Sequence, residues 1–420
     1  MEQLTKTVAA LAGEARRAAR ALASMPSGVK DAVLRAWADA LDARAREIIE
    51  ANTKDAEAAR ANGVSEALVD RLSLDEGRIH DMAEGLRRLV TLKDPVGTVL
   101  DGWTQENGLR IQKVRVPLGV IGVIYESRPN VTVDAAGLAL KSGNSVLLRG
   151  SRMAEHSNEA LVRVLQDAGR AVGLPAGAVQ AVPPTRESAT DMMLARGLID
   201  LLIPRGGAEL IQTTVRDSLV PVIETGVGNC HVYVDAAADL DKALAILVNA
   251  KVQRPAVCNA AESLLVHRAV ADAFVPRALD ALESRGVKVF GDEGIRAYDR
   301  DGSVAMATEQ EYRAEFYDLR ISAKVVDSLE EAIEHITEYG TQHTEAIVTE
   351  DYEAARRFVD AIDAAAVMVN ASTRFTDGGE FGMGAEVGIS TQKLHARGPM
   401  GLPELTTYKF VVYGTGQIRE

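Results

Sequence analysis

Short apolar strands alternate with helical segments along most of this chain of 420 residues, and this alternation constrains the fold more than any other feature. In the first series, β-forming runs with helical periodicity between them lie at 120–125, 145–148, 178–182, 198–203 and 220–223. A second series follows at 264–267, 287–290, 321–326, 346–348 and 366–369. Strands connected through helices pair in parallel, and the helices cover both faces of their sheet. The sequence therefore predicts two α/β domains, each built on a parallel sheet.

The two ends of the chain have different patterns. Residues 1 to about 92 have mainly helical periodicity, beginning with an amphipathic segment at the N-terminus. Residues 96–116 contain two β-forming stretches on either side of Asn107-Gly108, which favours a hairpin. The run 405–413 is strand-like, and we expect it to complete the sheet of that hairpin.

Composition argues against several classes of function. The formal net charge is −13 and aromatic residues make up only 4% of the chain, so a nucleic-acid partner is not expected. Two cysteines cannot form a disulfide framework, which favours a reducing, cytoplasmic location. No apolar stretch has the length of a membrane span, and the N-terminus lacks the pattern of a secretory signal. We therefore expect no membrane partner.

Cys258 is the strongest candidate for a chemical role. It lies in Arg254-Pro-Ala-Val-Cys258-Asn259, directly before an apolar run. A free cysteine is most often a small buried hydrophobe, whereas a nucleophilic cysteine needs a lowered thiol pKa. Arg254 or a helix N-terminus near Cys258 would lower that pKa. The other cysteine, Cys230, is expected to pack at the start of a strand.

Several long motifs together point to a known family. They are Cys258 downstream of the glycine-flanked Glu224, the segment 117–130 that ends in Asn130, and the segments 370–379 and 391–401. In these motifs, essentially the whole chain resembles the γ-glutamyl phosphate reductase family of the aldehyde dehydrogenase superfamily. The resemblance implies an aldehyde-dehydrogenase-like α/β fold with two parallel-sheet domains and a small oligomerisation sheet. We expect a cofactor-binding domain at 1–95 and 117–225, a catalytic domain at 226–400, and the oligomerisation sheet at 96–116 and 401–420.

The resemblance also implies a reaction. In this family a cysteine thiolate attacks a carbonyl carbon beside a nicotinamide ring. The implied activity is NADPH-dependent reduction of γ-glutamyl phosphate to glutamate 5-semialdehyde and phosphate, through a thioester on Cys258, in proline biosynthesis. The side-chain amide of Asn130 and the backbone N–H of Cys258 are the expected donors to the oxyanion.

The role of Glu224 stays open among three alternatives. In oxidising relatives the matching glutamate activates the water that hydrolyses the thioester. An NAD-dependent aldehyde oxidiser with Glu224 as general base is therefore the alternative function. In a reductase, Glu224 either relays protons to Cys258 or holds a loop. An inactive relative kept as a partner of a kinase is disfavoured, because Cys258 and Asn130 are both present.

The cofactor residues implied by the resemblance are Arg149, Gly150, Ser151, Arg205, Gly206, Gly207 and Glu315. Arg149 ends an expected strand where the family's basic residue contacts the adenosine ribose. An arginine fork suits a 2′-phosphate, so NADPH is favoured over NADH. The glycine turn, Arg205-Gly206-Gly207, leads into an expected helix whose amides would face the pyrophosphate. Glu315 matches the glutamate that holds the nicotinamide ribose.

The substrate presents a carboxylate, an ammonium group and a phosphate. The residues expected to bind it are Arg374, His395 and Arg397, and either arginine would hold an anionic group through its guanidinium. The alternative is that these arginines only hold loops together. No metal is expected, because no His, Cys, Asp and Glu cluster has metal-ligand spacing. The expected partners are the small-molecule substrate, further copies of the chain in a homo-oligomer, and glutamate 5-kinase in a transient complex.

Overall fold

The computed structural model describes residues 6–419 and confirms the α/β class, with mainly parallel sheets and small antiparallel ones. The chain divides into two units. Unit 1 comprises Met1–Thr225, Gly382–Gly388 and Met400–Glu420, and unit 2 comprises Gly226–Phe381 and Ile389–Pro399. No helix among the described residues is both long enough and apolar enough to cross a bilayer.

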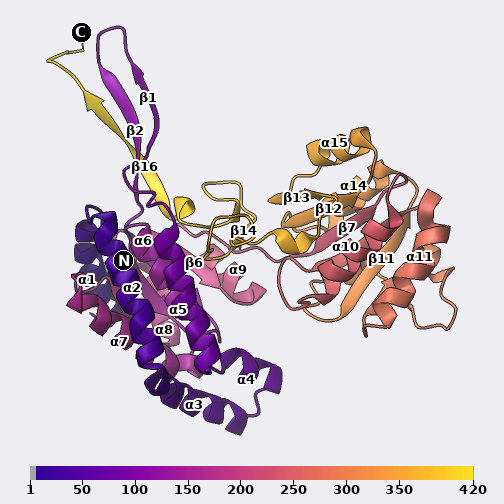
Figure 1. Ribbon diagram of the computed structural model, residues 1–420, viewed down its shortest axis with the longest axis horizontal. Helices are drawn as coiled ribbons and strands as arrows, with labels where there is room; N and C mark the ends of the chain where they lie inside the picture. Colours follow the sequence, from indigo (N-terminus) through magenta and orange to yellow (C-terminus); the bar gives the residue numbers. More distant parts are fainter. Residues whose placement is uncertain (1–5, 420) are drawn as a thin grey trace. The chain divides into compact units, whose positions relative to one another are not determined.

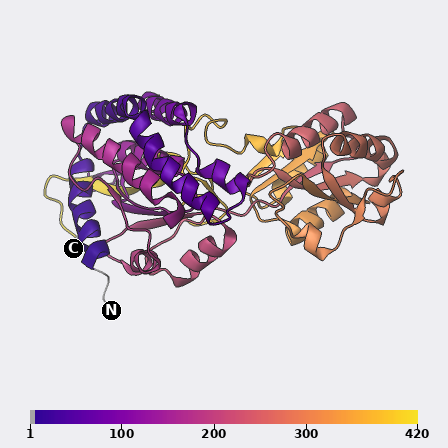
Figure 2. The ribbon, with the colours of Figure 1, turned by 90° about the horizontal axis from the view of Figure 1, so that it is seen from below.

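Unit 1 is built on a parallel sheet of four strands. Its strands are β3 (Val120–Tyr125), β4 (Ser145–Arg149), β5 (Val179–Ala181) and β6 (Leu201–Arg205), in the order β5-β4-β3-β6. Every residue of β3 is buried, because helices cover both faces of the sheet (Figures 1 and 2). Along the chain β4 follows β3 and pairs on one side of it, whereas the later strand β6 pairs on the other side. The strand order therefore reverses beside β3. Ligands of open parallel sheets bind at the carboxyl ends of the strands at such a reversal.

The helices of unit 1 come largely from the N-terminal part of the chain, as its periodicity predicts. They are α1 (Lys6–Leu22), α2 (Ser27–Ala43), α3 (Ala45–Ala61), α4 (Glu66–Leu72), α5 (Glu76–Thr91), α6 (Asn130–Lys141), α7 (Glu155–Ala171), α8 (Arg186–Leu194) and α9 (Ala208–Asp217). The amphipathic N-terminal helix is confirmed from Lys6 onward, and the expected helical residues 1–5 lie outside the described residues. Residues of α1 and α8 share an apolar cluster with β3, β4 and Leu202.

The prediction of a strand at 220–223 is wrong. Only Val222 forms a bridge, to Leu202 of β6. Pro221 has no N–H group, so a regular ladder cannot continue through it. Its carbonyl still accepts a hydrogen bond from the backbone N–H of Leu202, at 2.8 Å.

A three-stranded antiparallel arm belongs to unit 1. It contains β1 (Val99–Thr104), β2 (Arg110–Pro117) and β16 (Thr406–Tyr413), with β2 in the centre. The predicted pairing of the early hairpin with the last strand is therefore confirmed. The arm extends beyond the rest of unit 1 (Figure 1), and large apolar side chains are exposed along it. These are Val99, Leu100, Trp103, Tyr408, Phe410, Val412 and Tyr413.

Unit 2 is built on a parallel sheet of seven strands in the order β10-β9-β11-β8-β7-β12-β13. The strands are β7 (Cys230–Val234), β8 (Ala261–His267), β9 (Lys288–Gly291), β10 (Ala305–Met306), β11 (Arg320–Val326), β12 (Thr344–Val348) and β13 (Ala366–Val369). Shorter elements are α12 (Glu293–Arg296), α13 (Glu309–Tyr312), the 3-10 helices η2 (Thr373–Phe375) and η3 (Pro403–Leu405, in unit 1), and the antiparallel pair β14 (Ile389–Ser390) and β15 (Gly398–Pro399).

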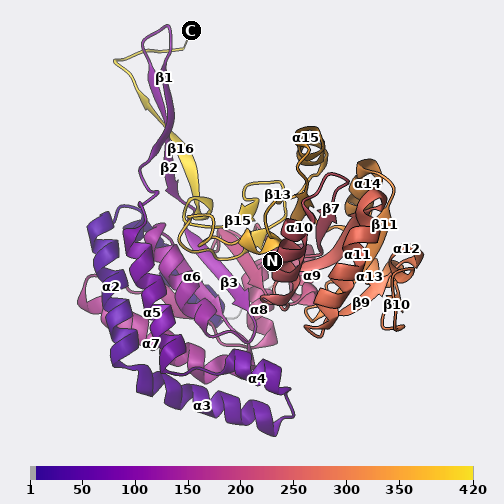
Figure 3. The same ribbon diagram turned by 45° about the vertical axis from the view of Figure 1, so that its right-hand side comes forward.

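Helices lie on both faces of this sheet (Figure 3), and alternating side chains of the interior strand β7 pack against helices on opposite faces. Val232 and Val234 lie in the cluster with α10 (Leu240–Val252) and α11 (Arg268–Glu283). Tyr233 lies in the other cluster, with α14 (Leu329–Tyr339) and α15 (Tyr352–Ala361). Its ring stacks on Phe358 with centroids 6.3 Å apart. Both faces are therefore covered, as a parallel sheet requires.

Candidate active site

The segment that carries Cys258 joins α10 to β8 at the amino edge of the unit 2 sheet. Cys258 is half-buried in a turn, three residues before β8 begins at Ala261. The chain after Cys258 enters a strand, so it does not provide the helix N-terminus considered as one means of activating the thiol. The remaining candidates are nearby cationic side chains.

The two cysteines have different environments. Cys230 is the first residue of β7 and is fully buried, which confirms its predicted place at a strand start. Burial raises the pKa of the Cys230 thiol well above its usual value, with nearby carboxylates such as Glu345 adding to the effect. Cys230 Sγ donates a hydrogen bond to the carbonyl oxygen of Cys258 at 3.2 Å. Cys230 therefore supports the turn as a neutral thiol, whereas Cys258 is partly accessible.

Gly228 packs directly against the backbone of Cys258. A Cβ atom on Gly228 would lie 1.5 Å from the Cys258 carbonyl oxygen, so no other residue fits without moving the turn. The backbone N–H of Gly228 donates to Oε1 of Glu315 at 2.9 Å. Gly228 thus connects Glu315, an expected cofactor residue, to the turn that carries Cys258.

Glu315 has a second carboxylate oxygen besides the one that accepts from Gly228. Its Oε2 is buried, and the Tyr317 side chain interacts with the Glu315 carboxylate, as do the Gly228 N–H and the charge of Lys251. Burial raises the pKa of Glu315. Tyr317, which the sequence analysis did not single out, interacts with Glu315, and burial followed by this interaction raises the pKa of its phenol. Its backbone is left-handed with φ of 53°, an uncommon conformation for a bulky side chain.

Arg374 is the expected substrate residue that the structure brings to the nucleophile segment. It lies in η2, is half-buried, and donates from Nε to Oε1 of Gln253 at 2.8 Å. Asn259 ties the same region to the turn, because its Nδ2 donates to the carbonyl of Thr376 at 2.8 Å. Burial lowers the pKa of Arg374, and the charge of Arg254 lowers it further. No carboxylate forms an ion pair with Arg374 among the described residues.

Arg397 and His395 lie in the segment of unit 2 between β14 and β15. Arg397 Nη1 forms an ion pair with Asp363 at 2.7 Å, and Lys393 pairs with the same carboxylate. His395 is exposed and has a left-handed backbone with φ of 72°. The contacts of Arg397 therefore fit the alternative role of holding a loop.

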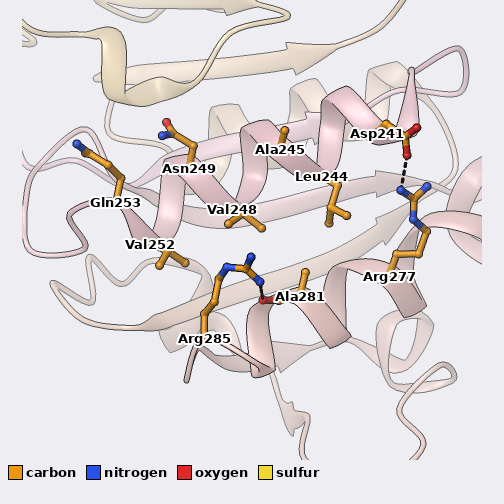
Figure 4. A pocket seen from close by; sticks show the side chains of 10 residues that line it. All are labelled: Asp241, Leu244, Ala245, Val248, Asn249, Val252, Gln253, Arg277, Ala281 and Arg285. Atoms are coloured by element: carbon orange, nitrogen blue, oxygen red, sulfur yellow. Dashed lines mark hydrogen bonds and ion pairs between the residues drawn. The ribbon is translucent and has the colours of Figure 1, made fainter.

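Gln253 also lines a hollow between α10 and α11 (Figure 4). The cavity has a volume of about 540 Å³ and a largely apolar lining. Its lining residues are Asp241, Leu244, Ala245, Val248, Asn249, Val252, Gln253, Arg277, Ala281 and Arg285. Arg277 pairs with Asp241 at one end, and Arg285 donates to the carbonyl of Ala281. None of the predicted site residues lines this hollow.

In unit 1, Asn130 is the first residue of α6, and its side chain is already oriented by a carboxylate. Asn130 Nδ2 donates to Oδ2 of Asp134 at 3.0 Å, one turn further along the helix. Burial raises the pKa of Asp134 to about 6, while Asn130, Arg205 and Arg88 act in the opposite direction. Asp134 was not among the predicted site residues, although its i, i+4 spacing from Asn130 is the signal that would have identified it.

Arg149 ends β4 at the carboxyl edge of the unit 1 sheet, beside a small hollow of about 70 Å³. Its Nη2 donates to the carbonyl of Thr185 at 2.8 Å, and burial lowers its pKa. Arg149 Nε, Ser151 Oγ and Asn158 Nδ2 are buried polar atoms without a hydrogen-bond partner among the described residues. A Cβ atom on Gly150 would lie 2.1 Å from Asn158 Nδ2. These unpaired groups around a hollow at a strand end fit the ribose side of a dinucleotide.

The glycine turn at the end of β6 begins α9, as its sequence indicates. Gly207 is the N-cap residue, and its N–H donates to Oε2 of Glu126 at 3.0 Å. A Cβ atom on Gly206 would lie 2.6 Å from Cδ of Glu126. Thus a carboxylate of the chain itself interacts with the start of this helix. Glu224 is half-buried in the irregular segment that follows the Val222 bridge.

Among residues 6–419, no group of three or more His, Cys, Asp and Glu side chains is arranged to hold a metal ion. The candidate residues thus form two sets, each within one unit. In unit 2, Cys258, Glu315 and Arg374 lie at the amino edge of the sheet. In unit 1, Asn130 begins α6 and Arg149 ends β4.

Comparisons with known proteins identify the family of this chain. The model of the aldehyde dehydrogenase family matches residues 2–295. A γ-glutamyl phosphate reductase of Thermobifida fusca is 58% identical over 420 residues and covers 100% of both chains. One from Moorella thermoacetica is 58% identical over 407 residues, or 97% of each chain.

Solved structures agree with this placement. The crystal structure of γ-glutamyl phosphate reductase from Thermotoga maritima matches with a TM-score of 0.96 at 50% identity, covering 99% of this chain and 100% of that one. An engineered glycolyl-CoA reductase with bound NADP+ has the same fold, with a TM-score of 0.70 at 17% identity, covering 98% of each chain. The chain therefore belongs to the aldehyde dehydrogenase superfamily and, within it, to the γ-glutamyl phosphate reductases.

Proposed function

We propose that the chain reduces γ-glutamyl phosphate to glutamate 5-semialdehyde and phosphate with NADPH, through a thioester on Cys258. The observation that carries the proposal is the contrast between two cysteines: Cys230 is buried and neutral, while Cys258 is partly accessible beside Arg374. The proposal includes a cytoplasmic location and a transient complex with glutamate 5-kinase, which would supply the acyl phosphate.

The Cys258 thiolate attacks the acyl carbon and forms a C–S bond, and the C–O bond to phosphate then breaks. Phosphate is a good leaving group, so this step needs little acid catalysis. When bound, the reduced nicotinamide supplies the hydride that reduces the thioester carbonyl. Collapse of the resulting thiohemiacetal oxyanion releases the aldehyde and regenerates the thiolate. The backbone N–H of Cys258 and the amide of Asn130 are the proposed donors to the oxyanion, and one such donor typically contributes ~10²–10³ in rate.

The buried polar groups described above suit the cofactor and the substrate. Arg149 and Ser151 would hold the ribose that bears the 2′-phosphate, while Glu315 Oε2 would accept from the nicotinamide ribose. Arg374 would hold an anionic group of the substrate, because it has no ion-pair partner among the described residues and lies beside the Cys258 segment. Arg397 is a weaker candidate because its guanidinium already pairs with Asp363.

The first prediction concerns the nucleophile. Cys258→Ala should lower turnover at least about a thousandfold, because no other group forms the thioester. The matched variant Cys230→Ala should keep activity within about tenfold, since it removes only a small buried thiol. The assay is reduction of NADP+ by glutamate semialdehyde in the presence of phosphate, which is the reverse reaction. A near-normal rate for Cys258→Ala would exclude the mechanism, and turnover without phosphate would favour the aldehyde oxidiser that uses Glu224.

The second prediction concerns cofactor choice. Arg149→Ala should weaken NADPH binding about 10- to 100-fold by losing a charge-assisted hydrogen bond to the 2′-phosphate, and should leave NADH binding little changed. Arg163→Ala is the matched control, because this exposed arginine of α7 pairs only with Glu47 among the described residues. Fluorescence titration with both cofactors measures the difference. Equal losses for NADPH and NADH would show that Arg149 does not read the 2′-phosphate.

The third prediction concerns pH. Since the pKa of Asp134 is raised to about 6, this carboxyl is charged above that pH and neutral below it. Only the charged form is purely an acceptor, so it holds Asn130 Nδ2 best above pH 6. We expect turnover to fall as pH drops through about 6. Asp134→Asn should lower turnover at neutral pH and remove this dependence. An unchanged acidic limb in the kcat profile of Asp134→Asn would contradict this role.

The fourth prediction concerns association. We propose that the exposed apolar arm pairs with another copy of the chain, because apolar strands at a sheet edge favour such pairing. Light scattering at micromolar concentration should show a homodimer or a larger even assembly. Deleting 406–420 or introducing Phe410→Ser should lower the mass or the solubility, whereas Lys409→Ser should not. A stable monomer for the intact chain would refute the proposal.

A further inference from the structure

A fully buried ion pair closes the base of the segment that carries Cys258. Lys251 lies in the last turn of α10 and Glu262 is the second residue of β8, so the two flank that segment. Lys251 Nζ and Glu262 Oε2 are 2.6 Å apart, and both side chains are 0% exposed. The pair therefore joins the two ends of the ten-residue stretch 252–261, in which Cys258 lies.

Stability alone is a poor explanation for this pair. Removing two charges from water costs several kcal/mol per ion, and apolar replacements of buried pairs are often neutral or stabilising. The Glu262 carboxylate also interacts with the backbone of Tyr317, so the pair is linked to the segment that carries Glu315.

The surroundings of the pair connect it to the nucleophile. Titratable groups that interact with Lys251 and Glu262 come from other elements and include the carboxyls of Glu315 and Asp318 and the neutral thiol of Cys230. Glu315 holds Gly228, which packs on the Cys258 carbonyl, and Cys230 donates to that same carbonyl. Burial raises the pKa of Glu262 and lowers the pKa of Lys251, while each side chain shifts the pKa of its partner back toward the charged form.

We propose that the Lys251–Glu262 ion pair is a positioning element that holds Cys258 in its reactive geometry and balances the charge beneath it. The inference rests on Cys258 being the nucleophile. Because neither side chain is exposed, the pair acts through the turn and does not touch substrate or cofactor. Other contacts hold the turn from outside, such as Asn259 on Thr376, whereas this pair joins its two ends.

The experiment compares single and double variants. Lys251→Met with Glu262→Leu removes both charges together, which keeps the site neutral and favours folding. The singles Lys251→Met and Glu262→Gln each leave one partner. The matched control is Lys30→Met with Asp94→Asn, which removes a pair 2.9 Å long, with Lys30 0% exposed, from unit 1. For each variant, iodoacetamide alkylation of the Cys258 peptide is followed by mass spectrometry against pH, together with kcat, KM, NADPH binding and thermal melting.

We expect the double variant to fold and to bind NADPH normally while kcat and the alkylation rate fall about tenfold or more, because small displacements of a reacting group are costly. The singles should move the alkylation midpoint in opposite directions. Glu262→Gln leaves a cation and favours the thiolate at lower pH, and Lys251→Met moves the midpoint to higher pH. The control should remain within about twofold in kcat, as expected for a site outside the reaction.

Two outcomes would overturn the inference. One is a double variant with wild-type kcat and alkylation profile. The other is that the alkylation midpoints of Lys251→Met and Glu262→Gln both stay fixed or both move in the same direction. This second outcome tests the inference even if the double variant does not fold. Failure of the underlying function is distinguishable, because Cys258→Ala would then remain active. An inactive Cys258→Ala beside a normal double variant would reject only the positioning role.

Discussion

The close approach of Gly228 to the carbonyl of Cys258 is the constraint on which the candidate site depends. Only a residue without a Cβ atom allows this contact, which packs the turn that carries Cys258 against the segment before β7. Glu315 holds the glycine from one side, and Cys230 reaches the same carbonyl from β7. The backbone around Cys258 is therefore fixed by neighbours that are distant in sequence, while its side chain remains partly accessible.

The two parallel sheets present their polar groups in different ways. In unit 1, Arg149 and the glycine turn lie at the carboxyl ends of β4 and β6, beside the strand-order reversal, which is the usual ligand-binding edge. In unit 2, Cys258 and Glu315 precede β8 and β11, at the amino edge. In place of a strand, the turn that carries Cys258 has the buried Lys251–Glu262 pair at its base and the hydrogen bond from Asn259 to Thr376 beside it.

Local pattern predicted most of the fold and part of the site. The apolar runs identified most strands of both sheets, and the pairing of 96–116 with 405–413 was confirmed. The strand predicted at 220–223 does not form, because Pro221 interrupts the ladder. For β7, the sequence predicted only that Cys230 lies at the start of a strand. Its His231 is paired with the buried Glu345 at 2.9 Å, a partner that no local pattern reveals. The sequence also could not show that Arg397, unlike Arg374, forms an ion pair with a carboxylate, because its partner Asp363 is distant in the sequence. Asp134 and the Lys251–Glu262 pair became visible only as contacts.

The carboxylate of Glu126 at the start of α9 has a consequence for cofactor entry. A helix N-terminus normally attracts anions from solvent, yet here the Gly207 amide already has a negatively charged partner within the protein. A pyrophosphate arriving at this helix would exchange one anion for another, and Glu126 would have to swing away as the cofactor enters. The net gain from the helix dipole would then be small, so selectivity would depend on the strand-end groups that read the ribose.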